Sequence, residues 1–236
     1  MIKILNLLIL CLFSSCIVAE TIAIIGTGNV ASALGPAFAK QGHEIVYGSR
    51  NPSNPELQLL LDQTLVVNLQ HPENKPYVTS PREAAEKSQV VVLAVPGSAV
   101  SEVVLNLGDL TGKIVIDPTN SRVLGDDGHR VYPVETSYAE IIQDLVPESY
   151  VVKAFNTLNY RTMIDPDSSG GQVTIPIVGN HKPSKDFVAN LIRAMGLEAI
   201  DLGPVRFAHI LEGMLFLYVY GREAGTPFNY HLRIDE

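Results

Sequence analysis

The run Thr21-Ile22-Ala23-Ile24-Ile25-Gly26-Thr27-Gly28-Asn29-Val30-Ala31 decides how this chain folds. Its first five residues are apolar or β-branched, as in a buried strand, and a helical stretch extends from its end to about Gln41. Gly26 permits a tight turn, Gly28 lets a backbone approach a pyrophosphate, and the small Ala31 allows close helix–strand packing. The N–H groups at such a helix start attract phosphates. An ordinary glycine turn is the alternative, but the position between strand and helix favours a dinucleotide-binding fold.

The end of the second predicted strand indicates which dinucleotide binds. Residues 43–47 read as a strand, and Gly48-Ser49-Arg50-Asn51-Pro52 follows it. Folds that bind NAD usually carry Asp or Glu at this point, which holds the ribose hydroxyls. Ser49 and Arg50 instead offer a hydroxyl and a guanidinium fork, which suit a 2′-phosphate. We therefore expect NADP, against the alternative that Arg50 is only a solvated loop charge.

Apolar runs of strand length alternate with helical segments along the rest of the chain. They span residues 90–95, 113–117, 150–155, 174–178 and 198–202. Continuous apolar runs are typical of parallel strands that are buried on both faces. We therefore predict an α/β fold, a single Rossmann-type domain on a doubly wound parallel sheet.

Between these runs, local signals predict several helices. Residues 51–80 read as a helical patch near residues 56–62 and an irregular connection, and Ser80-Pro81 reads as a capped helix start. Residues 184–195 form an amphipathic pattern, with Phe187, Leu191, Ile192 and Met195 on one side. Residues 207–220 form a C-terminal helix that is more apolar than a surface helix, so we expect it to be buried or covered by a second copy in a homodimer.

The ends of the predicted strands outline a candidate site, because ligands of such sheets lie beyond the carboxyl ends of the strands. The segments found there are residues 26–30, Ser49 and Arg50, residues 95–97, Thr119 and Asn120, and Asn156 and Thr157. Taken singly, the last three groups read as ordinary polar turns. Taken together, we expect them to line one crevice.

Composition excludes several classes of function. The chain has 236 residues, 46% of them hydrophobic, and a net charge of −8, which argues against a partner that is a nucleic acid. Both cysteines lie in the first sixteen residues, so the body offers no cysteine nucleophile and no cysteine-based metal site. Its six histidines show no metal-ligand pairing, and a G-x-S-x-G nucleophile motif is absent. We expect no metal and no dedicated catalytic side chain.

The first nineteen residues, MIKILNLLILCLFSSCIVA, have the layout of a secretory signal peptide. We therefore predict a signal peptide at residues 1–19 and an NADP-binding domain at residues 20–236; a buried first strand or helix is the alternative. Cleavage after Ala19 or before Cys16 is expected, and the second would leave Cys16 as a lipid-bearing membrane tether. The leader predicts export to the periplasm or the medium, or a lipid anchor. NADP, a cytosolic cofactor, favours the cytoplasmic alternative.

Several strand-end segments together resemble a known family, the NADPH-dependent deazaflavin (coenzyme F-420) reductases. That family is also known as pyrroline-5-carboxylate reductase-like NADP-binding proteins, and it is related to the oxidoreductase domains of six-transmembrane metalloreductases. The segments that carry the resemblance are residues 24–28, Gly48-Ser49-Arg50-Asn51-Pro52, Leu93-Ala94-Val95-Pro96, Val151-Val152-Lys153-Ala154-Phe155-Asn156-Thr157 and Gly203-Pro204. The resemblance runs from about residue 21 to about residue 219.

The resemblance implies a role for each segment. The turn from Gly26 through Thr27, Gly28, Asn29 and Val30 would hold the pyrophosphate, and Ser49 and Arg50 would hold the 2′-phosphate. The nicotinamide side would be formed by Val95, Pro96, Ala154 and Asn156. The chain departs from these relatives in its leader, and it lacks their bundle of transmembrane helices, so a membrane haem partner would be another protein.

Three functions remain open from the sequence. The first is an NADP-dependent oxidoreductase that passes hydride to a deazaflavin, a flavin or a flavin-mediated acceptor, since hydride transfer needs two rings held face to face and little else. The second is an imine reductase like pyrroline-5-carboxylate reductase, which would need a longer helical domain after about residue 170. The third is a non-catalytic NADP-binding or sensor module.

Two residues near the predicted site could be mistaken for catalytic groups. We expect Lys153 to be structural or a solvent-facing tip rather than a general acid, and His209 to be a helix-start residue.

Overall fold

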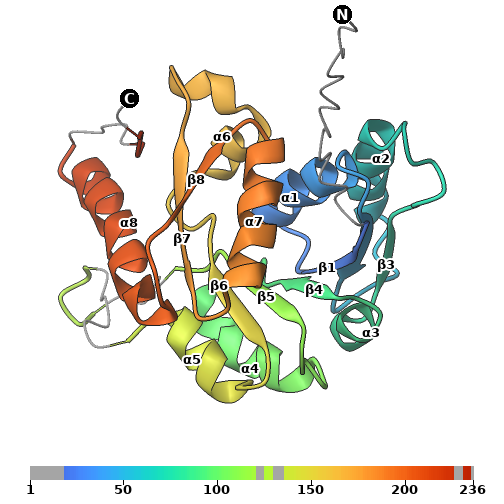
Figure 1. The fold of residues 1–236 in the computed structure, drawn as a ribbon, viewed down its shortest axis with the longest axis horizontal. Coiled ribbons are helices and arrows are strands. Elements are labelled where there is room, and N and C mark those ends of the chain that lie inside the picture. Colours follow the sequence, from blue (N-terminus) through green and yellow to red (C-terminus); the bar gives the residue numbers. More distant parts are fainter. Residues whose placement is uncertain (1–18, 121–124, 130–135, 226–230, 235–236) are drawn as a thin grey trace, which may run out of the picture.

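The computed structural model describes residues 19–120, 125–129, 136–225 and 231–234 (Figure 1). One eight-stranded sheet forms its centre, in the order β3-β2-β1-β4-β5-β6-β7-β8. The strands are β1 (Thr21–Ile25), β2 (Glu44–Gly48), β3 (Tyr77–Thr79), β4 (Val90–Val92), β5 (Ile114–Asp117), β6 (Tyr150–Lys153), β7 (Thr174–Gly179) and β8 (Glu198–Asp201). The helices are α1 (Asn29–Ala39), α2 (Leu57–Val67), α3 (Pro81–Glu86), α4 (Val100–Asn106), α5 (Tyr138–Leu145), α6 (Tyr160–Ile164), α7 (Lys182–Ala194) and α8 (Ala208–Glu223).

The strand order creates a switch point beside β1. This strand pairs in parallel with β2 on one side and with β4 on the other. The chain therefore winds outward in both directions from β1, and the loops that follow these strands diverge at the carboxyl edge of the sheet. Dinucleotides bind across such a point in open α/β sheets. The predicted α/β fold on a mostly parallel, doubly wound sheet is confirmed.

Helices cover both faces of the sheet, and two apolar clusters mark the layers. On one face, α1, α2, α6 and α7 contribute buried residues such as Leu34, Leu60 and Leu191. On the other face, α3, α4, α5 and the start of α8 contribute residues such as Val104 and Leu211. The buried strand residues between these layers are apolar on both faces, which is why the sequence showed continuous rather than alternating runs.

Two features of the sheet differ from the prediction. β7 runs antiparallel to β6, because the connection from Ala154 to Val173 contains only short helical turns and never crosses back to the opposite edge. β8 then pairs in parallel with β7, so both run against the first six strands. β3 lies within the stretch predicted as helix and irregular connection, and its three residues are only partly buried, which left no apolar run to detect.

The predicted helices lie close to the expected positions. Ser80 caps α3, its hydroxyl accepting a hydrogen bond of 3.3 Å from the Glu83 N–H. In α7, Leu191 and Ile192 are buried, and Phe187 and Met195 pack against the same cluster. The apolar C-terminal helix is α8, whose residues Ile210 and Leu217 are 54% and 62% exposed, so the homodimer stays a prediction. The predicted leader and the Cys16 tether lie outside the described residues.

Burial in the fold changes the pKa of the His43 side chain. Its ring is fully buried against Phe187, with ring centroids 5.9 Å apart, and its Nδ1 accepts a hydrogen bond of 3.1 Å from the Glu20 N–H. Burial lowers the pKa of His43 below its ordinary value, although the hydrogen bond from Glu20 opposes this. The neutral ring is therefore the form that the folded protein accepts.

We predict that His43 makes stability depend on pH. The unfolded histidine takes up a proton near pH 6.5, whereas the folded one does so only at lower pH. Its contribution is therefore present above pH 6.5 and lost as the pH falls through the folded pKa. Thermal denaturation between pH 7.5 and 5 should show a steeper fall of Tm in the wild type than in His43→Gln. The matched change His129→Gln, at a side chain that is 66% exposed, should leave the slope unchanged; equal slopes in all three proteins would contradict the prediction.

Candidate functional site

The turn after β1 depends on the absence of a side chain at Gly26. Its φ is +110°, in the region that favours glycine, and a Cβ there would lie 2.3 Å from the Ala94 carbonyl oxygen. The Gly26 N–H also donates a hydrogen bond of 2.9 Å to the Gly48 carbonyl. This one residue therefore joins the turns that follow β1, β2 and β4, as the sequence pattern required.

The start of α1 is open to a ligand. Gly28 is the N-cap residue, with φ −90°, and neither a capping side chain nor an acidic residue lies in the first turn. A Cβ placed on Gly28 would meet no atom within 4 Å, and Asn29 beside it is exposed. The first N–H groups of the helix are thus available to an anion, while Ala31 is fully buried against the sheet.

Ser49 and Arg50 lie at the carboxyl end of β2, on the same edge. The Ser49 N–H donates to the Thr79 carbonyl at 2.9 Å, which fixes the loop against the end of β3. The Ser49 hydroxyl accepts a hydrogen bond of 3.1 Å from the Asn51 N–H. Arg50 is exposed, and within the described part of the chain its guanidinium has neither an ion pair nor a hydrogen bond. A cation held free at a strand end suits a phosphate.

The remaining predicted segments meet along the same edge. A Cβ on Gly97 would lie 2.5 Å from the Asn120 carbonyl oxygen and 2.4 Å from the ring of Tyr138, so the turn after β4 lies against the turn after β5. Asn120 in turn donates to the Asn156 carbonyl at 2.9 Å, and Asn156 donates back to Asn120 Oδ1 at 3.0 Å. The segments after β4, β5 and β6 are therefore in contact, as expected.

The chain turns sharply after β6. Phe155 has a φ of +65°, the one positive φ outside glycine in the described residues, and its buried ring packs against Phe38 at 6.1 Å. This conformation directs the Asn156 side chain toward α8, where its Nδ2 donates to the Leu211 carbonyl at 2.8 Å. Strained backbone of this kind is concentrated at functional sites.

Two buried polar atoms at this edge lack a partner. Asn156 and Thr119 are only 3% and 4% exposed, yet Asn156 Oδ1 and Thr119 Oγ1 have no hydrogen bond among the described residues. Buried polar groups are normally satisfied, so an unpaired pair of acceptors indicates a ligand that donates hydrogen bonds. The carboxamide of a nicotinamide provides such donors.

The other residues predicted for the nicotinamide side differ in how far they are exposed to solvent. Val95 is half-buried and Pro96 is exposed, so both remain accessible at the edge. Ala154 is fully buried in the core, which leaves only its backbone near the site. His209 is half-buried and its Nδ1 contacts the Arg206 carbonyl at 2.7 Å, consistent with a helix-start residue.

Lys153 is fully buried and not a solvent-facing tip. Its Nζ contacts Asp117 Oδ2 at 2.8 Å, Glu212 Oε1 at 2.7 Å and the Thr119 carbonyl oxygen at 2.6 Å. Of the two roles expected for Lys153, a structural role and a solvent-facing tip, the contacts of its ammonium group support the structural role. The sequence analysis missed Glu212, although it is the one acidic residue in the apolar stretch 207–220 and could have been found on that basis.

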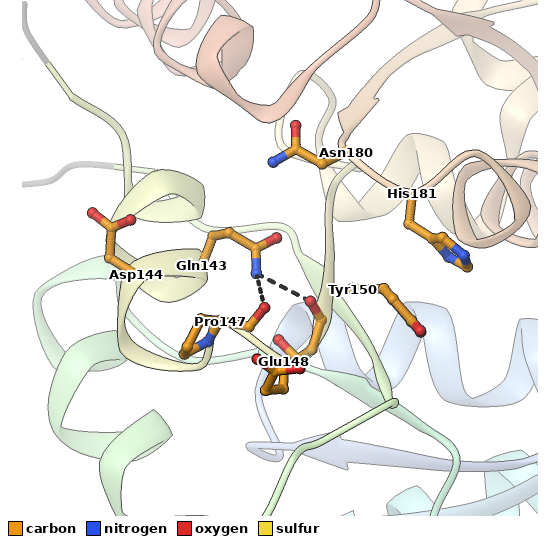
Figure 2. Close-up of a pocket in the computed structure, with 8 residues that line it drawn as sticks. Gln143, Asp144, Pro147, Glu148, Tyr150, Asn180 and His181 are labelled. Carbon is orange, nitrogen blue, oxygen red and sulfur yellow. Dashed lines mark hydrogen bonds between the residues drawn. The ribbon is translucent and has the colours of Figure 1, made fainter.

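A separate hollow lies at the opposite edge of the sheet (Figure 2). It has a volume of about 500 Å³ and is lined by Gln143, Asp144, Pro147, Glu148, Ser149, Tyr150, Asn180 and His181. Tyr150 begins β6, and its ring stacks on His181 at 3.8 Å. Because the amino end of β6 is remote from the strand ends described above, this hollow is not the predicted crevice.

The described residues offer neither a metal centre nor a membrane-spanning helix. They contain no group of three or more His, Cys, Asp or Glu side chains arranged to hold a metal ion. None of their helices is both long and apolar enough to cross a membrane.

The segments that meet at the carboxyl edge of the sheet also match known nucleotide-dependent proteins in sequence. Residues 21–121, which contain the glycine turn, the Ser49–Arg50 loop and the turn after β4, match the family described as NADP oxidoreductase, coenzyme F420-dependent. This part of the chain is therefore similar to the NADP-dependent oxidoreductases. A solved structure from Arthrobacter sp. FB24, assigned as an F420-dependent NADP reductase, covers 92% of this chain with a TM-score of 0.79 and 28% identity, and all of that chain is matched.

Curated relatives extend the similarity. The F420-dependent NADP reductase of Methanocaldococcus jannaschii is 29% identical over 205 residues, which are 82% of this chain and 88% of the relative. Metalloreductase STEAP3 of Rattus norvegicus is 29% identical over 197 residues, which are 83% of this chain. The matched region is only 36% of the metalloreductase, so this chain spans about a third of that relative's length.

We predict that Gly28→Ala separates folding from nucleotide binding. A Cβ at this position meets no protein atom and the backbone φ is ordinary, so Tm should stay within about 2 °C of the wild type. The methyl group would occupy the space where a pyrophosphate approaches, so the Kd for NADPH should rise at least about tenfold. Fluorescence titration of NADPH measures this. Gly26→Ala is the contrasting variant and should lower Tm as well, whereas an unchanged Kd in Gly28→Ala would place the nucleotide elsewhere.

Proposed function

We propose that the protein is a reductase that moves hydride between NADPH and a deazaflavin, a flavin or a flavin-mediated acceptor. The observation that carries the proposal is the free Arg50 at the end of β2, placed on the same edge as the open start of α1. Together they offer one site for the 2′-phosphate and one for the pyrophosphate of NADP.

The described residues fit the whole cofactor. The N–H groups at Gly28 and Asn29 would bind the pyrophosphate, and the Ser49 hydroxyl and the Arg50 guanidinium would bind the 2′-phosphate. Because the adenosine half then lies over β2, the nicotinamide half extends toward the ends of β4, β5 and β6. There lie Asn156 and Thr119, whose buried side-chain oxygens have no hydrogen-bond partner among the described residues. When bound, the nicotinamide supplies or takes up the hydride.

The surroundings of the nicotinamide end favour hydride transfer over acid–base chemistry. The charged side chains there, Asp117, Lys153 and Glu212, are all fully buried and bonded to one another, so none of them can reach a substrate. Direct hydride transfer between two stacked rings requires orientation and exclusion of water rather than a protein acid or base. A non-catalytic NADP-binding module fits the same observation and is the second candidate.

The names of the relatives suggest two kinds of acceptor. The archaeal relative is named for coenzyme F420, a deazaflavin, and the mammalian one for the reduction of metals. Both point to an acceptor that takes up electrons from NADPH. We favour a deazaflavin or flavin as the direct acceptor, because hydride transfer between two stacked rings needs orientation rather than a protein acid or base.

We predict that Arg50→Gln weakens NADPH binding by about tenfold to a hundredfold and leaves NADH binding unchanged, because only NADPH carries the 2′-phosphate. Isothermal titration with both nucleotides measures the two Kd values. Arg193→Gln, which removes an arginine that pairs with Glu198 at 2.8 Å, is the matched control and should change neither value. An equal loss for both nucleotides would show that Arg50 is not the specificity residue.

Stopped-flow absorbance at the NADPH band should distinguish a reductase from a binding module. We expect NADPH to be oxidised rapidly when a deazaflavin or a flavin is added, and more slowly or not at all with a ferric chelate alone. Gly28→Ala, which should fold but bind NADPH weakly, controls for direct chemistry between the reagents. If NADPH binds tightly and none of the acceptors oxidises it, the second candidate is correct.

A further inference from the structure

The strand ends that would hold the nicotinamide lie on a buried cluster of three charged side chains, Asp117, Lys153 and Glu212. All three side chains are 0% exposed. Lys153 lies between the two carboxylates, at 2.8 Å from Asp117 and 2.7 Å from Glu212. Ion clusters are costly to bury, because each charge must leave water. Because apolar side chains would hold α8 against the sheet at a lower cost, we expect the three charges to have a further role.

The position of the cluster relative to the crevice follows from the sheet register. Asp117 and Lys153 are neighbours in the β5–β6 pair and are the last residues of their strands. The Lys153 ammonium donates to the Thr119 carbonyl, and Asp117 Oδ1 accepts from the Thr119 N–H at 2.8 Å. The cluster is thus bonded directly to Thr119, which follows β5 at the carboxyl edge of the sheet and whose buried hydroxyl has no partner among the described residues.

The third member reaches the same place from α8. Glu212 follows Leu211, whose carbonyl accepts a hydrogen bond from Asn156, the second residue with an unpaired oxygen. Glu212 Oε1 also accepts from the Tyr138 N–H at 2.9 Å, which lies at the start of α5. One ion cluster therefore touches the end of β5, the end of β6, α5 and α8.

The charges of the cluster do not cancel when all three groups are ionised. Two carboxylates surround one ammonium, which leaves a net charge of −1. Burial raises the pKa of Glu212 and the Asp117 carboxylate adds to the rise, whereas Lys153 and the Tyr138 N–H favour the ionised form and limit it. Glu212 Oε2 is buried and has no hydrogen-bond partner in the part of the chain that the structure describes.

We propose that this cluster makes the site prefer the oxidised nucleotide, by placing uncompensated negative charge beneath the nicotinamide ring. The proposal rests on the proposed function, since it requires NADP at the crevice. The nicotinamide ring is positively charged in NADP⁺ and neutral in NADPH. A buried negative charge therefore attracts one form and not the other, and it is little screened by salt. Glu212 and Asp117 act here as charge-positioning residues that do not touch the reacting atoms.

The expected size of the effect can be estimated. For a charge on the order of 10 Å from the ring, and with the effective dielectric constant usual for proteins, the affinity ratio changes on the order of tenfold. A tenfold change in the ratio of the two Kd values shifts the potential of the bound two-electron couple by about 30 mV.

The decisive variant is Glu212→Gln, because it removes a charge and keeps the contacts. A glutamine oxygen can still accept from the Tyr138 N–H and from Lys153, and its amide nitrogen takes the place of an oxygen that has no partner. We would titrate the full chain with NADP⁺ and with NADPH at pH 8, where the carboxylate is most fully ionised. The ratio Kd(NADP⁺)/Kd(NADPH) should rise about tenfold.

Two further variants complete the experiment. Asp117→Asn removes the same charge from the other side of Lys153 and should raise the ratio in the same direction, which keeps the proposal testable if Glu212→Gln fails to fold. Glu223→Gln lies on the same helix at a side chain that is 45% exposed, and it should leave the ratio unchanged. Thermal denaturation of each variant checks folding.

The possible outcomes distinguish a failure of the proposed function from a failure of the further inference. If the wild type binds neither NADP⁺ nor NADPH, the proposed function fails. If it binds both, and Glu212→Gln and Asp117→Asn weaken both nucleotides equally or leave both unchanged, the cluster has only a structural role and the further inference is overturned. A rise in the ratio for both cluster variants and not for Glu223→Gln supports it.

Discussion

The contact between Gly26 and the Ala94 carbonyl is the constraint on which the crevice depends. The backbone after β1 approaches the backbone after β4 so closely that no side chain fits between them. The same residue hydrogen-bonds to the end of β2. Three strand ends are thereby held in one place, and α1 must begin where its first N–H groups face the open edge.

The other half of the site is held by polar interactions. Beyond β4, the turns are joined by the paired side chains of Asn120 and Asn156 and by the ion cluster around Lys153. Such networks specify a geometry but are sensitive to the loss of any member, since a buried charge left without its partner is strongly destabilising. The positive φ of Phe155, which costs about 1–3 kcal/mol in typical proteins, is maintained by this network and by its ring contact with Phe38. The turns after β1, β2 and β4 are therefore held together by backbone contacts, and the turns after β5 and β6 by side chains.

This division explains how much could be predicted from the sequence. Backbone-built features have strong local signals: the glycine turn, the apolar strands and the Ser49–Arg50 loop were all predicted from residues close together in the chain. Glu212 was missed because its partner Lys153 is 59 residues away, and an isolated acidic residue in an apolar helix does not reveal what it pairs with. The reversal of β7 was missed for a related reason, because strand composition does not encode direction. β3 carried too few buried residues to be recognised.

The reversed direction of β7 and β8 has a consequence for how the protein can change over evolution. The last residue of β8, Asp201, pairs with Ile177 of β7, so the chain leaves β8 near the level where β6 ends, and Glu212 in the first turns of α8 reaches the ends of β5 and β6. Every segment proposed to hold the nucleotide lies before residue 158, whereas Glu212, which pairs with Lys153, belongs to the last helix. Replacements in α8 can therefore reshape the wall beside the ends of β5 and β6 while the glycine turn and the Ser49–Arg50 loop keep their sequence.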